Sequence, residues 1–284
     1  MTQFLTLPDA INAFVHDGDC LALEGFTHLI PFAAGHEIIR QARKNLHLIR
    51  MTPDLIYDQM IGMGCASQLT FSWGGNPGVG SLHRLRDALE NRWPNALAIN
   101  EHTHAGMAAA YTAGAAQLPF GILRGYIGTD LTHANHNIKS VRCPFTDEQL
   151  TAIPAINPDV TILHAQQADR QGNVRLHGIT GAGREAGLAA KNLIVSVEEI
   201  VENFAPQMNA LLLPHWLVSA VVLCPGGAYP SYAQGYYPRD NVFYQAWDGI
   251  ARERETFRQW MQTHVLDTRD QREFLALIKR EIAA

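Results

Sequence analysis

Short apolar runs of strand length alternate with segments of helical periodicity over the first 116 residues of the chain. After a helix start at Thr6–Asp9, strands are predicted at 20–23, 46–51, 69–73 and 96–99, and helices at 32–43, 55–63, 82–93 and 106–116. Strands that alternate with helices pair in parallel through right-handed crossovers, and the helices cover both faces of the sheet. The alternation therefore predicts an α/β fold with an open, mostly parallel sheet. Ligands of such sheets bind where the strands end.

The pattern changes in the second half of the chain. Residues 125–156 lose the alternation and are rich in polar and aromatic side chains, which indicates an excursion from the sheet. Strand patterns return at 160–164, 193–197 and 217–223, and the tail from Phe243 is helical, with a final helix near 272–282. Because no repeat, low-complexity run or linker divides the chain, we expect a single domain over residues 1–284.

Composition excludes several classes of partner. A net charge of −5 without a cluster of Lys and Arg argues against nucleic acid or an anionic membrane. Cys20, Cys65, Cys143 and Cys224 are far apart and form no C-x-x-C motif, as is typical of reduced core thiols. The first residues have no signal-peptide pattern, and no run of 18 apolar residues exists. We therefore expect a soluble, cytoplasmic protein.

Three strand exits contain glycines that could bring the backbone close to a ligand. They are 23–28 with Gly25, 73–80 with four glycines within seven residues, and 224–231 with Gly226 and Gly227. Exposed N–H groups at such exits can hold an oxyanion or a phosphate. A tight turn explains the first exit without a ligand, and the second exit fits a plain loop and a binding loop equally. None matches G-x-G-x-x-G or a P-loop, which disfavours nucleotide hydrolysis.

The thirteen histidines do not form a recognisable metal motif. His102 and His104 are two residues apart at a strand exit, so their side chains point to opposite faces of an extended segment. His133 and His136 lie in the excursion, and no H-E-x-x-H pattern exists. We expect no metal, and hydrogen-bonded loop histidines explain the pattern. His104 lies where a substrate would bind.

Two carboxylates end predicted strands. If Glu24 is desolvated, its pKa rises and the group could serve catalysis. A carboxylate that anchors the turn is the simpler interpretation. Glu101 has the same two interpretations.

Several blocks of the sequence resemble the A subunits of family I CoA-transferases. The general family pattern is similar to Asp17-Gly18, Leu21–Leu23, Gly25-Phe26, His164–Asp169, Gly172–Val174 and Val221–Pro230. Longer blocks at 24–31, 50–54, 71–86, 225–228 and 232–236 resemble the branch of the family that acts on 3-oxoadipate. Glu24 stands where the general pattern has a glycine. The resemblance extends from Leu5 to the C-terminal helix.

The resemblance implies the family I CoA-transferase fold and one subunit of a heteromeric enzyme. The nucleophilic glutamate is then expected on a homologous CoA-transferase chain, the B subunit of the enzyme, and no catalytic residue is expected in this chain. CoA would pass from succinyl-CoA to 3-oxoadipate, giving 3-oxoadipyl-CoA and succinate, in the catabolism of aromatic compounds. The alternatives are another dicarboxylate acceptor such as glutaconate, a CoA-thioester hydrolase on the same fold, and a non-catalytic ligand-binding protein.

The expected ligands are CoA thioesters and small dicarboxylates, and no permanently bound cofactor is expected. The residues predicted to contact CoA or the substrate lie at the glycine exits and at the end of the fourth predicted strand. They are Glu24, Gly25, Phe26, Thr27, His28, Asn76, Gly78, His104, Gly226 and Gly227.

Overall fold

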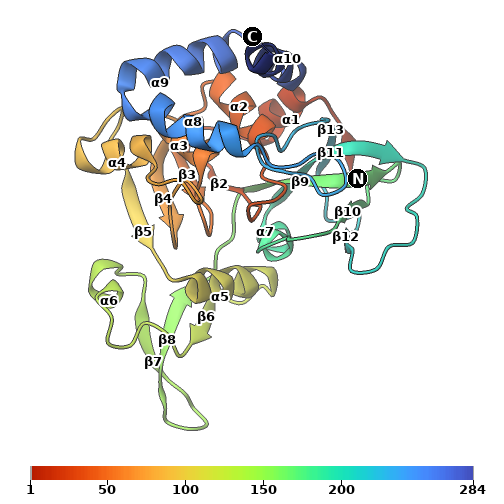
Figure 1. The fold of residues 1–284 in the computed structure, drawn as a ribbon. Helices are drawn as coiled ribbons and strands as arrows, with labels where there is room; N and C mark the ends of the chain where they lie inside the picture. Colours follow the sequence, from red (N-terminus) through yellow and green to blue (C-terminus); the bar gives the residue numbers. More distant parts are fainter. Residues whose placement is uncertain (1, 284) are drawn as a thin grey trace.

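The computed structural model describes residues 2–283 and contains a ten-stranded sheet and a three-stranded sheet (Figure 1). The parallel strands of the large sheet are β1 (Gln3–Phe4), β2 (Cys20–Leu23), β3 (Leu46–Ile49), β4 (Ala66–Phe71), β5 (Ala98–Glu101), β9 (Val160–Asp169), β11 (Asn192–Val201) and β13 (Ala220–Leu223). Their order across the sheet is β1-β13-β11-β9-β2-β3-β4-β5. All neighbours on this path are parallel, so their carboxyl ends meet along one edge.

Helices cover both faces of this sheet, as predicted (Figure 1). One face carries α1 (Leu7–Phe14), α2 (Phe32–Arg40), α3 (Leu55–Gly62), α4 (His83–Glu90), α8 (Asn241–Arg252), α9 (Arg254–Met261), a π-helix (Gln262–Leu266) and α10 (Gln271–Ala283). The other face carries α5 (His104–Ala115) and α7 (Gly183–Ala189). The predicted open parallel sheet with helices on both faces is therefore confirmed.

Helix caps explain several of these boundaries. The Thr6 hydroxyl accepts the N–H of Asp9 at the start of α1, and the Thr103 hydroxyl accepts the N–H of Gly106 at the start of α5. Such side-chain caps satisfy backbone donors that have no partner within the helix. The helix predicted at 82–93 ends instead at Glu90, because Arg92 has a φ of +56° and a proline follows at position 94.

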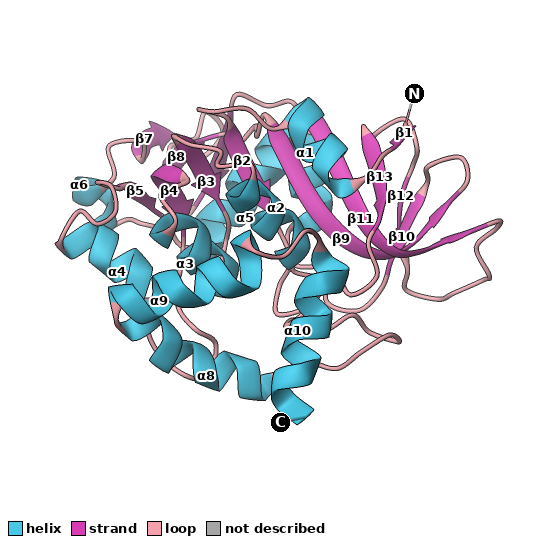
Figure 2. Cartoon of the chain, turned by 90° about the horizontal axis from the view of Figure 1, so that it is seen from above, coloured by secondary structure: helices cyan, strands magenta, loops and turns pink. Residues whose placement is uncertain are grey.

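The predicted excursion is a small antiparallel sheet. Its strands are β6 (Phe120–Leu123), β7 (Lys139–Arg142) and β8 (Gln149–Pro154), and a short helix α6 (Leu131–Ala134) precedes β7. Viewed from above, this sheet lies near β5, at the opposite end of the large sheet from β13 (Figure 2). The alternation is lost here because these strands pair with each other instead of with the large sheet.

Strands β9 and β11 are longer than predicted, and they carry a flanking ribbon. Their pairing continues from Asn192–Val160 to Val201–Asp169, well beyond the apolar runs at 160–164 and 193–197. The strands β10 (Val174–Leu176) and β12 (Leu211–Leu213) pair antiparallel beside β9, and the sequence pattern did not predict either of them. No helix of the described residues is both long and apolar enough to cross a bilayer.

Candidate active site

The loop that follows β2 has a strained backbone. Gly25, Thr27 and Leu29 have φ values of +155°, +59° and +54°, which side-chain-bearing residues rarely adopt. A β-carbon on Gly25 would lie 2.8 Å from the carbonyl oxygen of Leu29 and 2.9 Å from that of His28. Strain of this kind costs about 1–3 kcal/mol per residue, persists only where the surroundings enforce it, and clusters at functional sites. The segment 24–31 is therefore held in one conformation by its neighbours.

Arg50 is one of these neighbours. Its guanidinium is 1% exposed, and Nη2 donates to the carbonyl oxygen of Gly25 at 2.8 Å. Nη1 donates to the carboxylate of Asp54 at 2.9 Å, which forms a buried ion pair at the exit of β3. Burial raises the pKa of the Asp54 carboxyl, and the Arg50 charge opposes that rise. The ion pair thus supports the strained loop from within the protein.

Glu24 joins the exits of β2 and β3 to α5. Its Oε1 accepts the hydroxyl of Tyr111 at 2.8 Å and the N–H of Met51 at 3.2 Å. Burial raises the pKa of Glu24, whereas the Arg50 guanidinium and these hydrogen bonds oppose the rise. The contacts are those of a carboxylate that anchors the turn.

Hydrogen bonds continue across the exits of β3, β4 and β5. The Ser72 hydroxyl donates to the carbonyl oxygen of Met51 at 2.7 Å and lies 3.3 Å from Nδ1 of His104. Because the Ser72 hydroxyl donates its proton to Met51, Nδ1 of His104 is the donor in the contact with Ser72. His104 is exposed at the first position of α5, so its Nε2 is available to a ligand. Four neighbouring strand ends, β2 to β5, are thereby connected through Glu24, Met51, Ser72 and His104.

The second glycine exit is fixed at its base and open at its tip. Asn76 is 2% exposed and donates its side-chain amide to the carbonyl oxygen of Tyr244 in α8 at 2.7 Å. Its backbone N–H donates to the carbonyl oxygen of Gly80 at 2.8 Å, which closes the turn. Gly78 is exposed with a φ of +80°, and a β-carbon there would meet no atom within 4 Å. Within residues 2–283 no acceptor receives the Gly78 N–H.

The third glycine exit rests on a buried polar cluster. The N–H of Gly226 donates to Oε2 of Glu198 at 2.8 Å, and Nε2 of His164 lies 2.6 Å from Oε1 of the same carboxylate. The Tyr237 hydroxyl also donates to Oε1, at 2.6 Å. Burial acts to raise the pKa of Glu198, but the hydrogen bonds from His164, Tyr237 and Gly226 outweigh it and lower the pKa. The carboxylate therefore stays ionised inside the protein.

The same cluster has the connectivity of a hydrolytic triad. Ser196 Oγ lies 2.8 Å from Nδ1 of His164, whose Nε2 contacts Glu198. Ser196 is 0% exposed and His164 is 1% exposed. A β-carbon on Gly227 would lie 2.8 Å from the His164 ring, so the loop packs directly on the imidazole. Because Ser196 is fully buried, no substrate carbonyl can reach its hydroxyl, and the cluster is an anchor for the third exit.

Residues 227–244 join the three exits along the edge of the sheet. The N–H of Leu29 donates to the carbonyl oxygen of Tyr232 at 2.9 Å, and the Ser231 hydroxyl donates to the carbonyl oxygen of Thr27 at 2.9 Å. Arg239 donates to the carbonyl oxygen of Pro77 in the second exit at 3.0 Å. Segments about 200 residues apart in sequence therefore form one continuous surface at the carboxyl ends of the strands.

Some residues predicted to contact a ligand have protein partners instead. His28 is fully buried, with Nδ1 at 2.9 Å from the carbonyl oxygen of Ile179 and Nε2 accepting the N–H of Gln234 at 3.0 Å. Burial lowers the pKa of His28, so the ring is neutral and ties loop 24–31 to two other segments. The side-chain NH2 group of Asn76 likewise donates inside the protein, and its Oδ1 is buried without a partner among the described residues. These two residues shape the surface without presenting a polar side-chain atom to it.

The predicted backbone donors also differ from one another. The N–H of Gly226 donates to Glu198, and that of Gly227 donates to the carbonyl oxygen of Cys224 at 3.0 Å. Gly78 keeps its N–H free of acceptors within the described residues. Phe26 and Thr27 are half-buried in the strained loop. Among the predicted contacts, Gly78 and His104 are the exposed ones.

Sequence reasoning missed four residues that organise this surface. Arg50, Ser72, Tyr111 and Arg239 all contact a predicted exit, or a residue bonded to one. Arg50 could have been found from the sequence, because it is a charged residue directly after an apolar strand and has an oppositely charged residue, Asp54, four positions later. Tyr111 lies within an Ala-rich helical segment, and its contact with Glu24 follows only from the packing of α5 on the sheet.

Metal-ligating and thiol groups do not converge here. Within residues 2–283 no group of three or more His, Cys, Asp and Glu side chains could hold a metal ion. The cysteines are free; Cys65 and Cys224 are buried, whereas Cys20 and Cys143 are half-buried.

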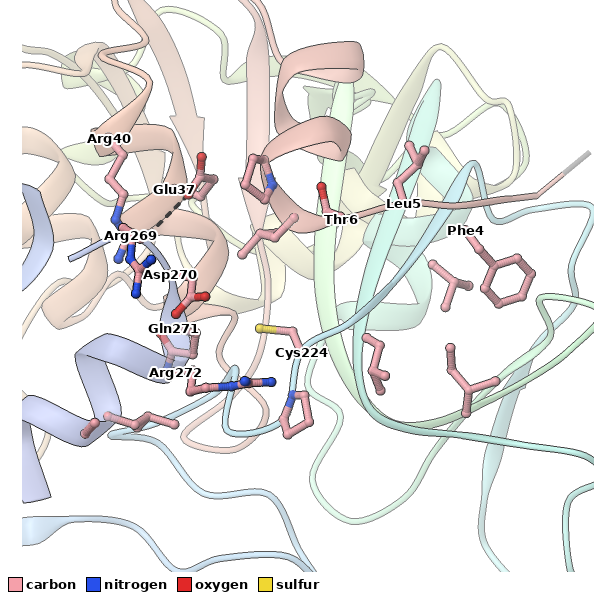
Figure 3. Close-up of a pocket in the computed structure, with 18 of the residues that line it drawn as sticks. Phe4, Leu5, Thr6, Glu37, Arg40, Cys224, Arg269, Asp270, Gln271 and Arg272 are labelled. Carbon is pink, nitrogen blue, oxygen red and sulfur yellow. Dashed lines mark hydrogen bonds and ion pairs between the residues drawn. The ribbon is translucent and has the colours of Figure 1, made fainter.

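A cavity of about 1070 Å³ lies beside the third exit, at the carboxyl ends of β1 and β13 (Figure 3). Leu5, Cys224 and Pro225 contribute apolar walls. Arg40 of α2 and Arg272 of α10 bring positive charge to its other side (Figure 3). Arg40 is paired with Glu37 at 3.2 Å, and Asp270 also lines the cavity, so its polar side carries both signs of charge.

Comparisons with known proteins agree with this architecture. A model of the coenzyme A transferase family matches residues 4–223. The chain is 63% identical to the A subunit of the 3-oxoadipate CoA-transferase of Pseudomonas knackmussii, over 98% of this chain and 99% of that protein. It is 31% identical to the A subunit of the glutaconate CoA-transferase of Acidaminococcus fermentans, over 97% and 91% of the two chains.

Solved structures give the same result. The crystal structure of the glutaconate coenzyme A-transferase from Acidaminococcus fermentans superposes with a TM-score of 0.90 at 30% identity, over 98% of this chain and 93% of that one. The decarboxylase AibA/AibB superposes with a TM-score of 0.80 at 28% identity, over 92% and 98% of the two chains. The matched family model covers most of the chain, and near-full-length relatives share its sequence and its fold. The chain therefore belongs to the coenzyme A transferase family.

Proposed function

We propose that this chain is the A subunit of a heteromeric CoA-transferase that moves CoA from succinyl-CoA to 3-oxoadipate in the catabolism of aromatic compounds. The products are 3-oxoadipyl-CoA and succinate. The observation that carries the proposal is the 63% identity, over almost the full length of both chains, to the A subunit of a 3-oxoadipate CoA-transferase. The glutaconate relative is 31% identical over a similar length, which favours 3-oxoadipate as the acceptor.

The nucleophile of this reaction is proposed to be a glutamate of the B subunit. Its carboxylate attacks the thioester carbonyl of succinyl-CoA and expels the CoA thiolate, which forms a mixed anhydride. The thiolate then attacks the glutamyl carbonyl, releases succinate and leaves CoA as a glutamyl thioester. The same two steps in reverse, with 3-oxoadipate as the incoming carboxylate, form 3-oxoadipyl-CoA. Covalent catalysis thus divides one difficult exchange into easier steps.

The present chain contributes one wall of the site. Each step passes through a tetrahedral oxyanion, and one suitably placed N–H donor lowers such a barrier by about 2.7–4 kcal/mol. The free N–H of Gly78 supports its assignment to this kind of role. Nε2 of His104, which the Nδ1–Ser72 contact leaves as an acceptor, is suited to accept a hydrogen bond from an N–H or O–H group of the substrate. Glu24 and Arg50 are deeply buried and hydrogen-bonded to the loop segments, so they hold the loops, and Glu24 does not attack the thioester.

Co-expression with the B subunit tests the proposal. The purified two-subunit complex is incubated with succinyl-CoA and one acceptor acid at a time, and the acyl-CoA products are identified by mass spectrometry. We expect 3-oxoadipyl-CoA as the main product, and no transfer by either chain in isolation. A preference for glutaconate would show that glutaconate, and not 3-oxoadipate, is the acceptor. Release of free CoA without any acceptor acid would identify a hydrolase. Transfer by the present chain in isolation would refute the placement of the nucleophile on the partner.

A further inference from the structure

Arg184, the second residue of α7, lies beside the loop that follows β2. We propose that its guanidinium, together with the backbone N–H of Phe26, binds the carboxylate of the substrate that does not react. The inference rests on the proposed function, in which succinyl-CoA and 3-oxoadipate each carry one such distal carboxylate. A cation that holds this group makes the enzyme selective for dicarboxylates over monocarboxylates of the same length.

The Arg184 guanidinium is available to a ligand. Its side chain is 60% exposed, and its ion-pair contact among the described residues is with Glu185 at 3.8 Å, which is longer than a hydrogen bond. Other arginines beside the strand exits are committed to the protein. Arg50 is buried in an ion pair, and the Arg239 guanidinium lies 3.8 Å from the centre of the Tyr244 ring. Arginine is suited to this role because its planar fork matches a carboxylate with two hydrogen bonds.

Packing places Arg184 next to the first glycine exit. Arg184 and Gly25 line the same small cavity, although they are far apart in sequence. Glu24 also lines this cavity, but its carboxylate accepts the Tyr111 hydroxyl and is stabilised by the Arg50 charge. The acidic group nearest to the exit is therefore already matched inside the protein, and Arg184 keeps its charge for a ligand.

The N–H of Phe26 points to the same side of the loop. Arg50 donates to the carbonyl oxygen of Gly25 from within the protein, and the C=O and N–H groups of a trans peptide point in opposite directions. The Phe26 N–H is therefore directed away from Arg50, and no acceptor receives it within residues 2–283. A β-carbon on Gly181 would lie 2.8 Å from Cβ of Phe26 and 3.7 Å from its backbone nitrogen. Glycine at 181 thus lets the segment that carries Arg184 approach this N–H.

The spacing of the exits suits a short dicarboxylate. Strands β2 and β4, which precede Gly25 and the Gly78 loop, are separated by β3 alone. Neighbouring strands are about 4.7–4.9 Å apart, so these two exits are about 10 Å apart. A chain of three to five C–C bonds, each about 1.5 Å long, can bridge this span with a hydrogen bond of about 2.9 Å at either end. The reacting carboxyl group is then at Gly78 and the distal one at Phe26 and Arg184.

The test changes Arg184 in the two-subunit complex. Exchange of labelled succinate into succinyl-CoA is measured for the wild type, for Arg184→Gln and for the control Arg170→Gln, which alters an exposed arginine paired with Glu202. Arg184→Gln should raise the KM values of succinate and succinyl-CoA about 10-fold, as expected for a lost hydrogen bond to a charged group. The kcat should change little, because the contact is made equally in the ground state and the transition state. Arg184→Lys keeps the charge and should recover part of the affinity.

Butyryl-CoA distinguishes this role from a structural one. It has the chain length of succinyl-CoA without the distal carboxylate, and its inhibition constant against succinyl-CoA is measurable whether or not it reacts. This constant should be the same for the wild type and Arg184→Gln. A wild-type KM for succinyl-CoA in Arg184→Gln would overturn the proposal, as would equal weakening of succinyl-CoA and butyryl-CoA. Because the exchange needs no 3-oxoadipate, a complex that shows the Arg184 effect but rejects 3-oxoadipate refutes only the acceptor.

A backbone ester tests the second donor. Phenyllactic acid in place of Phe26 removes the N–H and keeps the side chain. The KM of succinyl-CoA should rise about 10-fold, whereas the inhibition constant of butyryl-CoA should not change. A wild-type KM for the ester would refute the part of the proposal that concerns Phe26.

Discussion

Alanine substitutions at Gly25 and Gly78 should distinguish a glycine that is needed for folding from one that is needed for the reaction. In loop 24–31, a β-carbon at Gly25 would contact backbone oxygens at 2.8 and 2.9 Å, and a backbone cannot rotate away as a side chain can. Overpacking of this kind costs about 1–3 kcal/mol, and an unfavourable φ adds about 1–3 kcal/mol. We therefore expect Gly25→Ala to lower the free energy of unfolding by about 3 kcal/mol.

Gly78→Ala should behave differently. Its β-carbon meets nothing within 4 Å, so the loss of stability comes from the positive φ alone and should be about 1 kcal/mol. The new methyl group stands in the open space beside the free N–H. If that N–H binds the oxyanion, turnover per folded complex should fall on the order of 10²-fold.

The assay combines urea unfolding of the two-subunit complex, followed by tryptophan fluorescence, with steady-state kinetics on the same preparations. The expected pattern is a large loss of stability at position 25 and a large loss of turnover at position 78. Wild-type stability of Gly25→Ala would refute the argument from the backbone contacts. Normal turnover of Gly78→Ala would show that the second exit only turns the chain.

Three further predictions concern the core and the chemistry. Arg50→Met should destabilise the complex by about 3–5 kcal/mol, because Asp54 is left as a buried, unpaired carboxylate; a urea midpoint equal to that of the wild type would contradict this. Burial lowers the pKa of His36 from 6.5 to about 3, so the unfolded chain takes up the proton first. Stability should then fall as the pH drops from about 6.5 toward 3, by up to about 1.4 kcal/mol per unit, and His36→Gln should flatten this slope in urea titrations. Chelator-treated complex should keep its activity, and a loss that zinc restores would reveal a metal site.

The alternation of short apolar runs with helical segments was sufficient to predict the α/β class. Burial on both faces of a parallel sheet favours apolar residues in the strands at 20–23 and 46–49, where His47 is the one polar residue, and this local signal needs no knowledge of distant residues. The family followed from blocks at the strand exits, where residue choice reflects local backbone conformation. Gly25 and Gly78 were recognisable for this reason.

Long-range contacts decided the rest. The sequence pattern marked all three glycine exits as candidate ligand contacts, yet the N–H of Gly226 donates to Glu198 and that of Gly78 has no acceptor within the described residues. The partners of Glu24 lie 27 and 87 positions away, at Met51 and Tyr111. Such pairs form because the parallel sheet brings all its strand ends to one edge. The chemistry available at that edge depends on which polar groups the packing consumes, and no local pattern encodes that outcome.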